Sequence, residues 1–382
     1  MRRRSNGPIY QMLYRTGMRL ISSLPMKYRA PLFGLVLIII VVVLVVSLSG
    51  CPAPGQRNGN SGRAPQVGEM TLAVWNVENL YDDQDDPKVH DDSENWFAAN
   101  PDMFRTKVNR VAEGLLKINE GSGPDIACLI EVESIRCMEA VKDAMNAKLR
   151  SAGRADQQYT HVVFLGDRGG RFFAPGYLSR IPALGDRTRT FGARTNGRVL
   201  EGHFQADGQE LVILSGHWTS RVTDKDEDGS RRMSYANDCY GRLRAILTAN
   251  PDAEVIVCGD FNDEFNDASL QQGLKVSRST DTVRDSLREP RLLALFADWN
   301  GDPSGTVYGR GNWAIFDHIC VSRGLLDGKG WQLVPNSANI FAPPEMRFGK
   351  KQEPFRFGGD KHTGERGFSD HFPLTARFRI AK

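Results

Sequence analysis

The chain has 382 residues, of which 25% are charged and 40% are hydrophobic, and its formal net charge is +3. This is the composition of an ordinary globular protein, and the length allows one large domain with a sizeable core. Seven basic residues and no acidic residue lie between Met1 and Arg29, so the rest of the chain carries a net charge of −4. Such a domain does not bind long nucleic acid through its overall charge, and any affinity for phosphates has to be local or carried by a metal ion.

The N-terminal segment, residues 1–51, is typical of an export signal. Its basic stretch precedes Leu32 to Leu48, 17 residues without a charge, and this order indicates membrane insertion with the basic end inside. The run ends at Leu48-Ser49-Gly50-Cys51, which resembles a bacterial lipoprotein signal in which Cys51 is lipidated. A retained transmembrane anchor and a plain cleaved signal are the alternatives. All three place the domain outside the cytoplasmic membrane, in the cell envelope.

Residues 52–68, rich in Pro, Gly, Asn and Ser, are predicted to be a flexible linker, and residues 69–382 to be the exported domain. In its first part, strand and helix patterns alternate. In chain order they predict a strand at 71–75, a helix at about 102–119, a strand at 125–130 and a helix at about 134–152.

The middle of the domain contains short strand-like runs separated by Gly or Asp, which predict neighbouring antiparallel strands. These runs lie at 159–165, 171–178, 198–205 and 210–214. A helix at about 234–249 and strands at 255–258, 315–321 and 372–379 follow. Strands of both kinds with helices between them favour a four-layer α/β/β/α sandwich, in which two mixed β-sheets pack face to face between helices.

Polar residues terminate or interrupt the apolar runs, and this is where α/β enzymes gather their functional groups. They are Asn76, Glu131, His217, Asp260, Asn262, Asp317, His318, Asp370 and His371. Strand ends on one edge of a sheet converge, so we expect these side chains to share one site.

Six segments that carry these residues resemble the endonuclease/exonuclease/phosphatase superfamily, typified by deoxyribonuclease I-like enzymes. The segments are Trp75-Asn76-Val77-Glu78-Asn79, Ile130-Glu131-Val132-Glu133, Ser215-Gly216-His217-Trp218, Gly259-Asp260-Phe261-Asn262-Asp263, Phe316-Asp317-His318-Ile319 and Ser369-Asp370-His371-Phe372-Pro373. Any one of them is weak evidence, but all six occur in the order of the family and span about residues 70 to 380.

The resemblance implies a metal site. Glu131 would be the principal ligand of Mg²⁺ or Mn²⁺, with Asn76 close by and Asp370 supporting the metal or His371. Oxygen ligands suit such hard ions, which also bind substrate phosphate. Ca²⁺ is a weaker candidate, because Asp224 to Gly229 copies the opening of a calcium loop but has Tyr235 where the loop requires a glutamate.

The resemblance also implies roles for the remaining groups. Asp260 and Asn262 would orient the attacking water and the phosphate. His371, aligned by Asp317, would act as base or phosphate contact, and His217 would be the second histidine. A histidine paired with a buried carboxylate is held in one tautomer and made more basic. His318 is expected only to line its strand.

Two further features have ordinary interpretations. The stretch from Asp82 to Glu94 holds six aspartates and one glutamate, which favours a solvated loop over a group that holds extra cations. Among the five cysteines after Cys51, Cys137 and Cys239 fall in helix-like segments and could pair in an oxidising compartment.

The sequence therefore predicts an exported, membrane-tethered, monomeric phosphodiester hydrolase that depends on Mg²⁺, most plausibly a nuclease with nucleic acid as its substrate. A phosphatase or a phospholipase C- or sphingomyelinase-like enzyme is the first alternative, since superfamily members act on all these substrates with the same core. A non-catalytic surface binding module is the second. Retention of every expected site residue argues against it.

Overall fold

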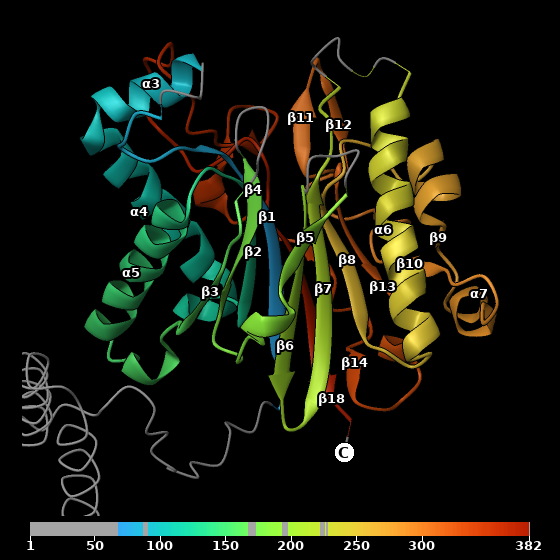
Figure 1. Ribbon diagram of the computed structural model, residues 1–382. Helices are drawn as coiled ribbons and strands as arrows, with labels where there is room; N and C mark the ends of the chain where they lie inside the picture. Colours follow the sequence, from blue (N-terminus) through green and yellow to red (C-terminus); the bar gives the residue numbers. More distant parts are fainter. Residues whose placement is uncertain are drawn as a thin grey trace, which may run out of the picture. The chain divides into compact units, whose positions relative to one another are not determined.

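Two large β-sheets face each other in the computed structural model, which describes residues 68–86, 91–166, 173–192, 198–221, 226 and 228–381 (Figure 1). In spatial order, the first sheet consists of β14 (Trp331–Leu333), β18 (Leu374–Ile380), β1 (Met70–Leu80), β2 (Ile126–Val132), β4 (Ala174–Ser179) and β3 (His161–Val163), with β15 (Asn339–Ile340) also beside β18. The second consists of β5 (Arg189–Phe191), β6 (Val199–Ala206), β7 (Gln209–His217), β8 (Val255–Asp260), β13 (Asp317–Val321), β10 (Leu292–Ala294) and β9 (Val276–Ser277).

Two small antiparallel pairs lie apart from these sheets. They are β11 (Val307–Gly309) with β12 (Asn312–Ala314), and β16 (Arg347–Phe348) with β17 (Glu353–Pro354). Single-turn helices connect other elements at Ile118–Gly121, Ala155–Gln157, Gly185–Arg187, Ser269–Leu274, Arg323–Leu326 and Pro344–Met346.

Helices cover the outer faces of both sheets (Figure 1). On the side of the first sheet lie α3 (Asp92–Ala99), α4 (Pro101–Lys117) and α5 (Ile135–Ser151), and on the side of the second lie α6 (Ser230–Ala249) and α7 (Thr280–Asp285). Central strands are therefore covered on both faces, which explains why apolar runs such as that of β8 show no alternation. The predicted four-layer sandwich of two mixed sheets is confirmed.

Most predicted elements appear within a few residues of their expected bounds. The predicted antiparallel neighbours of the middle region also appear, as the β3–β4 and β6–β7 pairs, although these two pairs belong to different sheets. Among the elements that the sequence patterns did not predict is α3, which begins at Asp92, inside the acidic stretch that we expected to be a loop. Asp91 caps this helix by accepting a hydrogen bond from the Ser93 amide, so an acidic residue here starts a helix.

The pairing of Cys137 with Cys239, which the sequence left open, does not occur in the structure. Cys137 in α5 and Cys239 in α6 are both buried free thiols, and the two helices belong to different outer layers of the sandwich. Helical spacing in the sequence does not reveal on which sheet a helix packs, and this decides whether two cysteines can meet.

The predicted leader, Cys51 and residues 52–67 of the linker lie outside the described residues. By its contacts the chain divides into residues 1–63 and 64–382. Within the part that the structure describes, no helix is both long and apolar enough to cross a membrane.

Gly259 allows the two parallel strands β7 and β8 to lie close together next to His217 and Asp260. Its φ is +133°, and a Cβ at this position would lie 2.0 Å from the carbonyl oxygen of Gly216, its partner in the register. Only glycine fits such a contact without moving the backbone. The glycine before Asp260 therefore has a structural reason within the Gly-Asp-Phe-Asn motif.

Candidate active site

Three of the predicted site residues are neighbours in the register of the second sheet. His217 at the end of β7 pairs with Asp260 at the end of β8, and Asp260 pairs with Asp317 at the start of β13. Residues that are directly opposite on adjacent strands place their side chains on the same face. The sheet therefore places the imidazole of His217 in one row with the two buried carboxylates of Asp260 and Asp317.

Two residues of the first sheet reach the same place. Asn76 lies in β1 and Glu131 follows the part of β2 that pairs with it, where the β1–β2 register is irregular. Glu131 has a φ of +66°, a conformation that L-residues rarely adopt, and its Oε2 accepts a hydrogen bond from the amide of Asn79 at 2.7 Å. Such backbone strain is common at functional sites.

The amide of Asn76 joins the two sheets. Its Nδ2 donates to Glu131 Oε1 at 3.1 Å and to Asp260 Oδ2 at 2.9 Å, while its Oδ1 accepts from the amide of Glu78 at 3.0 Å. The side-chain nitrogen of Asn76 therefore bridges the carboxylates of Glu131 and Asp260, while its side-chain oxygen is used by a backbone amide. His217 Nε2 lies 3.6 Å from Glu131 Oε1 and 3.7 Å from Asp260 Oδ2.

His371 completes the group from the C-terminal part of the chain. Its Nδ1 lies 2.7 Å from Asp317 Oδ2, and its Nε2 lies 3.9 Å from Asp260 Oδ2. Its backbone is fixed to β1, since Trp75 Nε1 donates to the carbonyl of His371 and Ser369 Oγ donates to the carbonyl of Asn76. The histidine is thus held in a defined orientation with Nε2 toward the carboxylates.

The charges of these groups influence one another strongly. Burial opposes ionisation of Glu131, but the charge of His217 and hydrogen bonds from Asn76 and Asn79 hold the pKa of Glu131 below its ordinary value. Burial and the nearby Asp317 raise the pKa of Asp260. Burial would lower the pKa of His371, but Asp317 and Asp260 raise it well above the ordinary value.

The donors at this site suit a hard divalent cation. Glu131 and Asp260 offer carboxylate oxygens on either side of one amide nitrogen, and Asp317 Oδ1 is buried without a hydrogen-bond partner among the described residues. One ligand atom from each of Asp260, Asp317 and His371 lies within 4.8 Å of the others. Oxygen-rich sites of this kind bind Mg²⁺, Mn²⁺ or Ca²⁺ in preference to soft metals.

The sequence matches the Endonuclease/Exonuclease/phosphatase family over residues 71–380. The chain belongs to this family. A family protein from Bacteroides thetaiotaomicron has a similar fold, with a TM-score of 0.50 and 14% identity over 82% of this chain and 98% of that one. No curated protein matches the sequence closely enough to count as a relative.

Two other solved structures resemble the chain less closely. The human nocturnin catalytic domain with bound sulfate has a TM-score of 0.46 and 17% identity, covering 83% of this chain and 96% of that one. A variant of beta toxin from Staphylococcus aureus with bound magnesium ions has a TM-score of 0.49 and 13% identity, covering 82% and 100%. Members of the endonuclease/exonuclease/phosphatase family are metal-dependent hydrolases of phosphoesters.

Two of the predicted residues lie beside the central group of this family site. Asn262 has a φ of +51°, its amide nitrogen donates to Asp260 Oδ1 at 2.9 Å, and its Nδ2 donates to the carbonyl of Trp218. Asp370 is 40% exposed and lies 3.8 Å from Arg356, at the rim of the site. The role predicted for each stays a prediction.

His318 turns away from this site. It is buried, its Nε2 contacts the carbonyl oxygen of Asp263, and its ring stacks on Phe261. Burial lowers the pKa of this imidazole. The side chain therefore packs behind β8, although it is next to Asp317 in the sequence.

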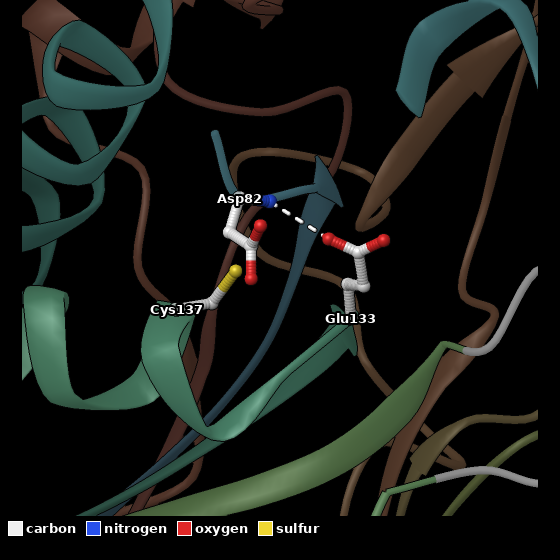
Figure 2. A group of neighbouring side chains, drawn as sticks. All are labelled: Asp82, Glu133 and Cys137. Atoms are coloured by element: carbon white, nitrogen blue, oxygen red, sulfur yellow. Dashed lines mark hydrogen bonds between the residues drawn. The ribbon is translucent and has the colours of Figure 1, made fainter. Parts of the chain in front are cut away.

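A second group with metal-ligating side chains comprises Asp82, Glu133 and Cys137 (Figure 2). Asp82 Oδ2 accepts from Ser134 Oγ at 2.6 Å, and the Asp82 amide donates to Glu133. Burial raises the pKa of the Cys137 thiol, which donates to the carbonyl of Leu80. Burial also raises the pKa of Glu133 to about 8. The hydrogen bonds of this group join the end of β1 to the start of α5.

The expectation of a solvated acidic loop is wrong for two of its residues. Asp82 is 6% exposed and Glu94 is fully buried. Backbone and hydroxyl donors explain this burial, because Glu94 Oε1 accepts from the amide of Asp86 and Asp82 accepts from Ser134. Charge runs in a sequence do not show which carboxylates find such donors.

Three residues near the site were not singled out from the sequence. Glu78 is buried and binds Arg356, and Lys107 is fully buried with its Nζ donating to the carbonyl of Phe368. Burial lowers the pKa of Lys107 to about 8, although Glu78, Asp370 and Glu131 favour its charge. Glu78 lies in a motif of the family, but Arg356 and Lys107 have no local pattern that marks them.

Proposed function

We propose that the chain is a divalent-metal-dependent phosphodiesterase whose substrate is nucleic acid. The observation that carries this proposal is the meeting of Asn76 and Glu131 from one sheet with Asp260 from the other, beside the Asp317–His371 pair. Phosphodiester cleavage requires negative charge on phosphoryl oxygens to be neutralised and water to be oriented. A site with oxygen ligands and two imidazoles meets both needs.

Each residue has a definite task in this reaction. A bound Mg²⁺ supplies Lewis-acid neutralisation of the phosphoryl oxygens, and Glu131 with Asp260 would hold it. Asp260 and Asn262 orient the attacking water. His371 contacts the phosphoryl group through Nε2, since Asp317 occupies its Nδ1. His217, at the end of β7, contacts the same group.

A hairpin with two aromatic side chains lies beside His371, and it favours a nucleotide rather than a lipid headgroup as the substrate. Val307 of β11 forms a β-bridge with His371, and Trp313 of β12 stacks on Phe372 with 6.2 Å between ring centroids. Tyr308 is opposite Trp313 in the register, and both rings are half-buried. Aromatic faces stack on bases irrespective of sequence, and this contact is worth about 1–3 kcal/mol per base.

The place of action is also part of the proposal. The uncharged run Leu32 to Leu48 behind seven basic residues, followed by Cys51, supports export of the enzyme and its tethering to the membrane. Cell fractionation of the wild type and a Cys51→Ser variant would test this. Release of only the variant supports lipidation, and retention of both supports a transmembrane anchor.

The activity is tested with a substrate panel on the purified full chain. Single-stranded DNA, RNA, bis-p-nitrophenyl phosphate and sphingomyelin vesicles would each be incubated with Mg²⁺, Mn²⁺ or Ca²⁺, and with a chelator. We expect hydrolysis of nucleic acid that stops with the chelator. Glu131→Gln is the matched control, because it preserves shape but removes a charged ligand.

Three outcomes separate the alternatives. Turnover of sphingomyelin but not of nucleic acid would show that the chain is a lipid phosphodiesterase. Turnover of bis-p-nitrophenyl phosphate alone would indicate a small phosphoester as substrate. No metal-dependent turnover of any substrate, with a native melting transition, would indicate a binding module and end the proposal.

A further inference from the structure

A buried carboxylate fixes an arginine at the rim of the active site. Glu78, 3% exposed, accepts hydrogen bonds from Arg356 Nε at 3.0 Å and from Arg356 Nη2 at 2.6 Å. Glu78 lies two residues after Asn76 in β1, and Arg356 lies 278 residues later in the chain. The guanidinium is therefore held by the strand that carries the centre of the site.

The arginine is not needed to anchor its own loop. Glu78 also accepts from the backbone amides of Phe357 at 2.7 Å and Gly358 at 3.2 Å. Arg366 donates to the carbonyls of Phe357, Gly358 and Gly359 in the same segment. These contacts tie the loop to β1 and to itself without the guanidinium.

Arg356 is placed to meet a ligand. Its side chain is 57% exposed, its Nη2 lies 3.8 Å from Asp370 Oδ2, and its Nη1 donates to no acceptor in the described part of the chain. Lys107, which also interacts with the charges of Glu78 and Asp370, is fully buried. Of these two cations, only Arg356 can therefore reach a molecule that arrives from solvent.

A guanidinium that is fixed in one plane and leaves donors free is suited to phosphoryl oxygens, which it can bind with two parallel hydrogen bonds. We propose that Arg356 binds a non-bridging oxygen of the scissile phosphoryl group, and that Glu78 orients it for this contact. The inference rests on the proposed function and adds a substrate-binding residue and a positioning residue to it. No pairing is broken, because Glu78 keeps its hydrogen bonds from Nε and Nη2. The N–H groups of Nη1 and the second N–H of Nη2 are the donors that would meet the ester.

The test is binding of inorganic phosphate to the purified full chain in Mg²⁺, measured by isothermal titration calorimetry. Arg356→Ala is expected to weaken phosphate binding by roughly 10- to 100-fold, the range for loss of a charge-assisted hydrogen bond. Arg356→Lys restores part of this affinity, because lysine keeps the charge but not the planar fork. The melting temperature of each variant reports whether it folds.

Arg366→Ala is the matched control. It removes an arginine that donates its hydrogen bonds to the loop carbonyls and lies over the rings of Trp96 and Phe357. It is therefore expected to lower the melting temperature while phosphate affinity stays as in the wild type. An equal loss of affinity in Arg366→Ala would show that loop order, not direct contact, is responsible, and would overturn the inference.

Glu78→Gln tests the positioning role. It is expected to weaken phosphate binding less than Arg356→Ala and to add nothing in the double variant, because both changes act through one guanidinium. Additive losses would overturn the role of Glu78.

Two substrates locate the contact. Loss of kcat/KM in Arg356→Ala is expected for both bis-p-nitrophenyl phosphate and an oligonucleotide, since both contain the scissile phosphoryl group. Loss for the oligonucleotide alone would place Arg356 on a flanking phosphate and overturn the assignment. Equal phosphate affinity of the wild type and Arg356→Ala, or no phosphate binding by the wild type, would also overturn it. A chain that binds phosphate through Arg356 without hydrolysing either ester would refute the proposed function instead.

Discussion

The active site and the cluster around His203 contain the same kinds of side chains, but their polar atoms are used differently. His203 in β6 is buried, with Nε2 at 2.7 Å from Glu201 Oε1 and Nδ1 at 2.5 Å from Glu210 Oε1. Glu201 also accepts hydrogen bonds from Nε and Nη2 of Arg242 in α6, each at 2.6 Å. Every ring nitrogen and both Glu201 oxygens therefore have a partner.

The active site leaves comparable atoms open. His371 uses Nδ1 for Asp317, but the nearest carboxylate oxygen to its Nε2 that the structure describes, on Asp260, is 3.9 Å away. Asp317 Oδ1 is buried without a hydrogen-bond partner among the described residues. Buried polar atoms without partners are costly, so folding alone does not favour this arrangement. The saturated cluster stabilises the fold, whereas the open one is suited to a ligand.

The largest effect that this comparison predicts is on catalysis. Asp317→Asn keeps the shape of the side chain but removes the charge that orients His371, so we expect kcat to fall by roughly 10²- to 10⁴-fold. The melting temperature should change little, because Asp317 also raises the pKa of Asp260 through repulsion. Steady-state kinetics and thermal unfolding measure the two effects. Activity close to that of the wild type would show that His371 needs no orienting carboxylate.

Glu201→Gln should have the opposite signature. The amide removes the negative charge and replaces one of the two acceptor oxygens by an NH2 donor, so a buried donor of His203 or Arg242 loses its acceptor. We therefore expect a loss of roughly 3 kcal/mol in the free energy of unfolding. The kcat of the folded variant should equal that of the wild type. A variant that kept its stability but lost activity would break the distinction between the two clusters.

The same residue predicts a pH dependence of stability. Burial opposes ionisation of Glu201, but hydrogen bonds from Arg242 and His203 lower the pKa of this carboxyl from 4.5 to about 2. A group with a lowered pKa in the folded chain contributes stability that is complete above pH 4.5 and is lost as the pH falls toward 2. Urea unfolding at several pH values should therefore show the difference between wild type and Glu201→Gln shrinking across that window.

Metal binding provides a fourth test of the comparison. An ion that binds only the folded chain stabilises it by about 2.7 kcal/mol at a concentration of 100 times its Kd. Mg²⁺ should raise the melting temperature of the wild type and of Glu201→Gln equally, but not that of Glu131→Gln. An unchanged response in Glu131→Gln would place the stabilising ion outside the proposed site.

The sequence contained enough information for the centre of the site but not for its rim. Asn76, Glu131, His217, Asp260, Asp317 and His371 all end or begin apolar runs of the sequence. A shared sheet edge accounts for the meeting of His217, Asp260 and Asp317 in the second sheet, and the resemblance to the family implied that Asn76, Glu131 and His371 join them. Their grouping could therefore be expected without coordinates. The same argument predicted the sandwich, because strand and helix patterns depend on local periodicity.

The rim depends on contacts that no local pattern encodes. Arg356 lies in a loop, and its partner Glu78 lies in an unusual conformation with a φ of +56°. Lys107 looks like any polar residue of an amphipathic helix, yet its Nζ reaches the carbonyl of Phe368 inside the protein. The error over the acidic stretch has the same cause, since carboxylates such as Glu94 are buried only where backbone donors happen to meet them.

Glu210→Gln gives the smallest effect and sharpens the description of the saturated cluster. Glu210 binds the second nitrogen of His203 but is 28% exposed and also pairs with Arg187 on the surface. Solvent screens such contacts, so we expect a loss of about 1 kcal/mol or less in the free energy of unfolding, well below that of Glu201→Gln. Urea unfolding of both variants gives the comparison. Equal losses would mean that the whole His203 network acts as one unit, whereas the expected inequality would assign its stability to the buried Glu201–Arg242 pair.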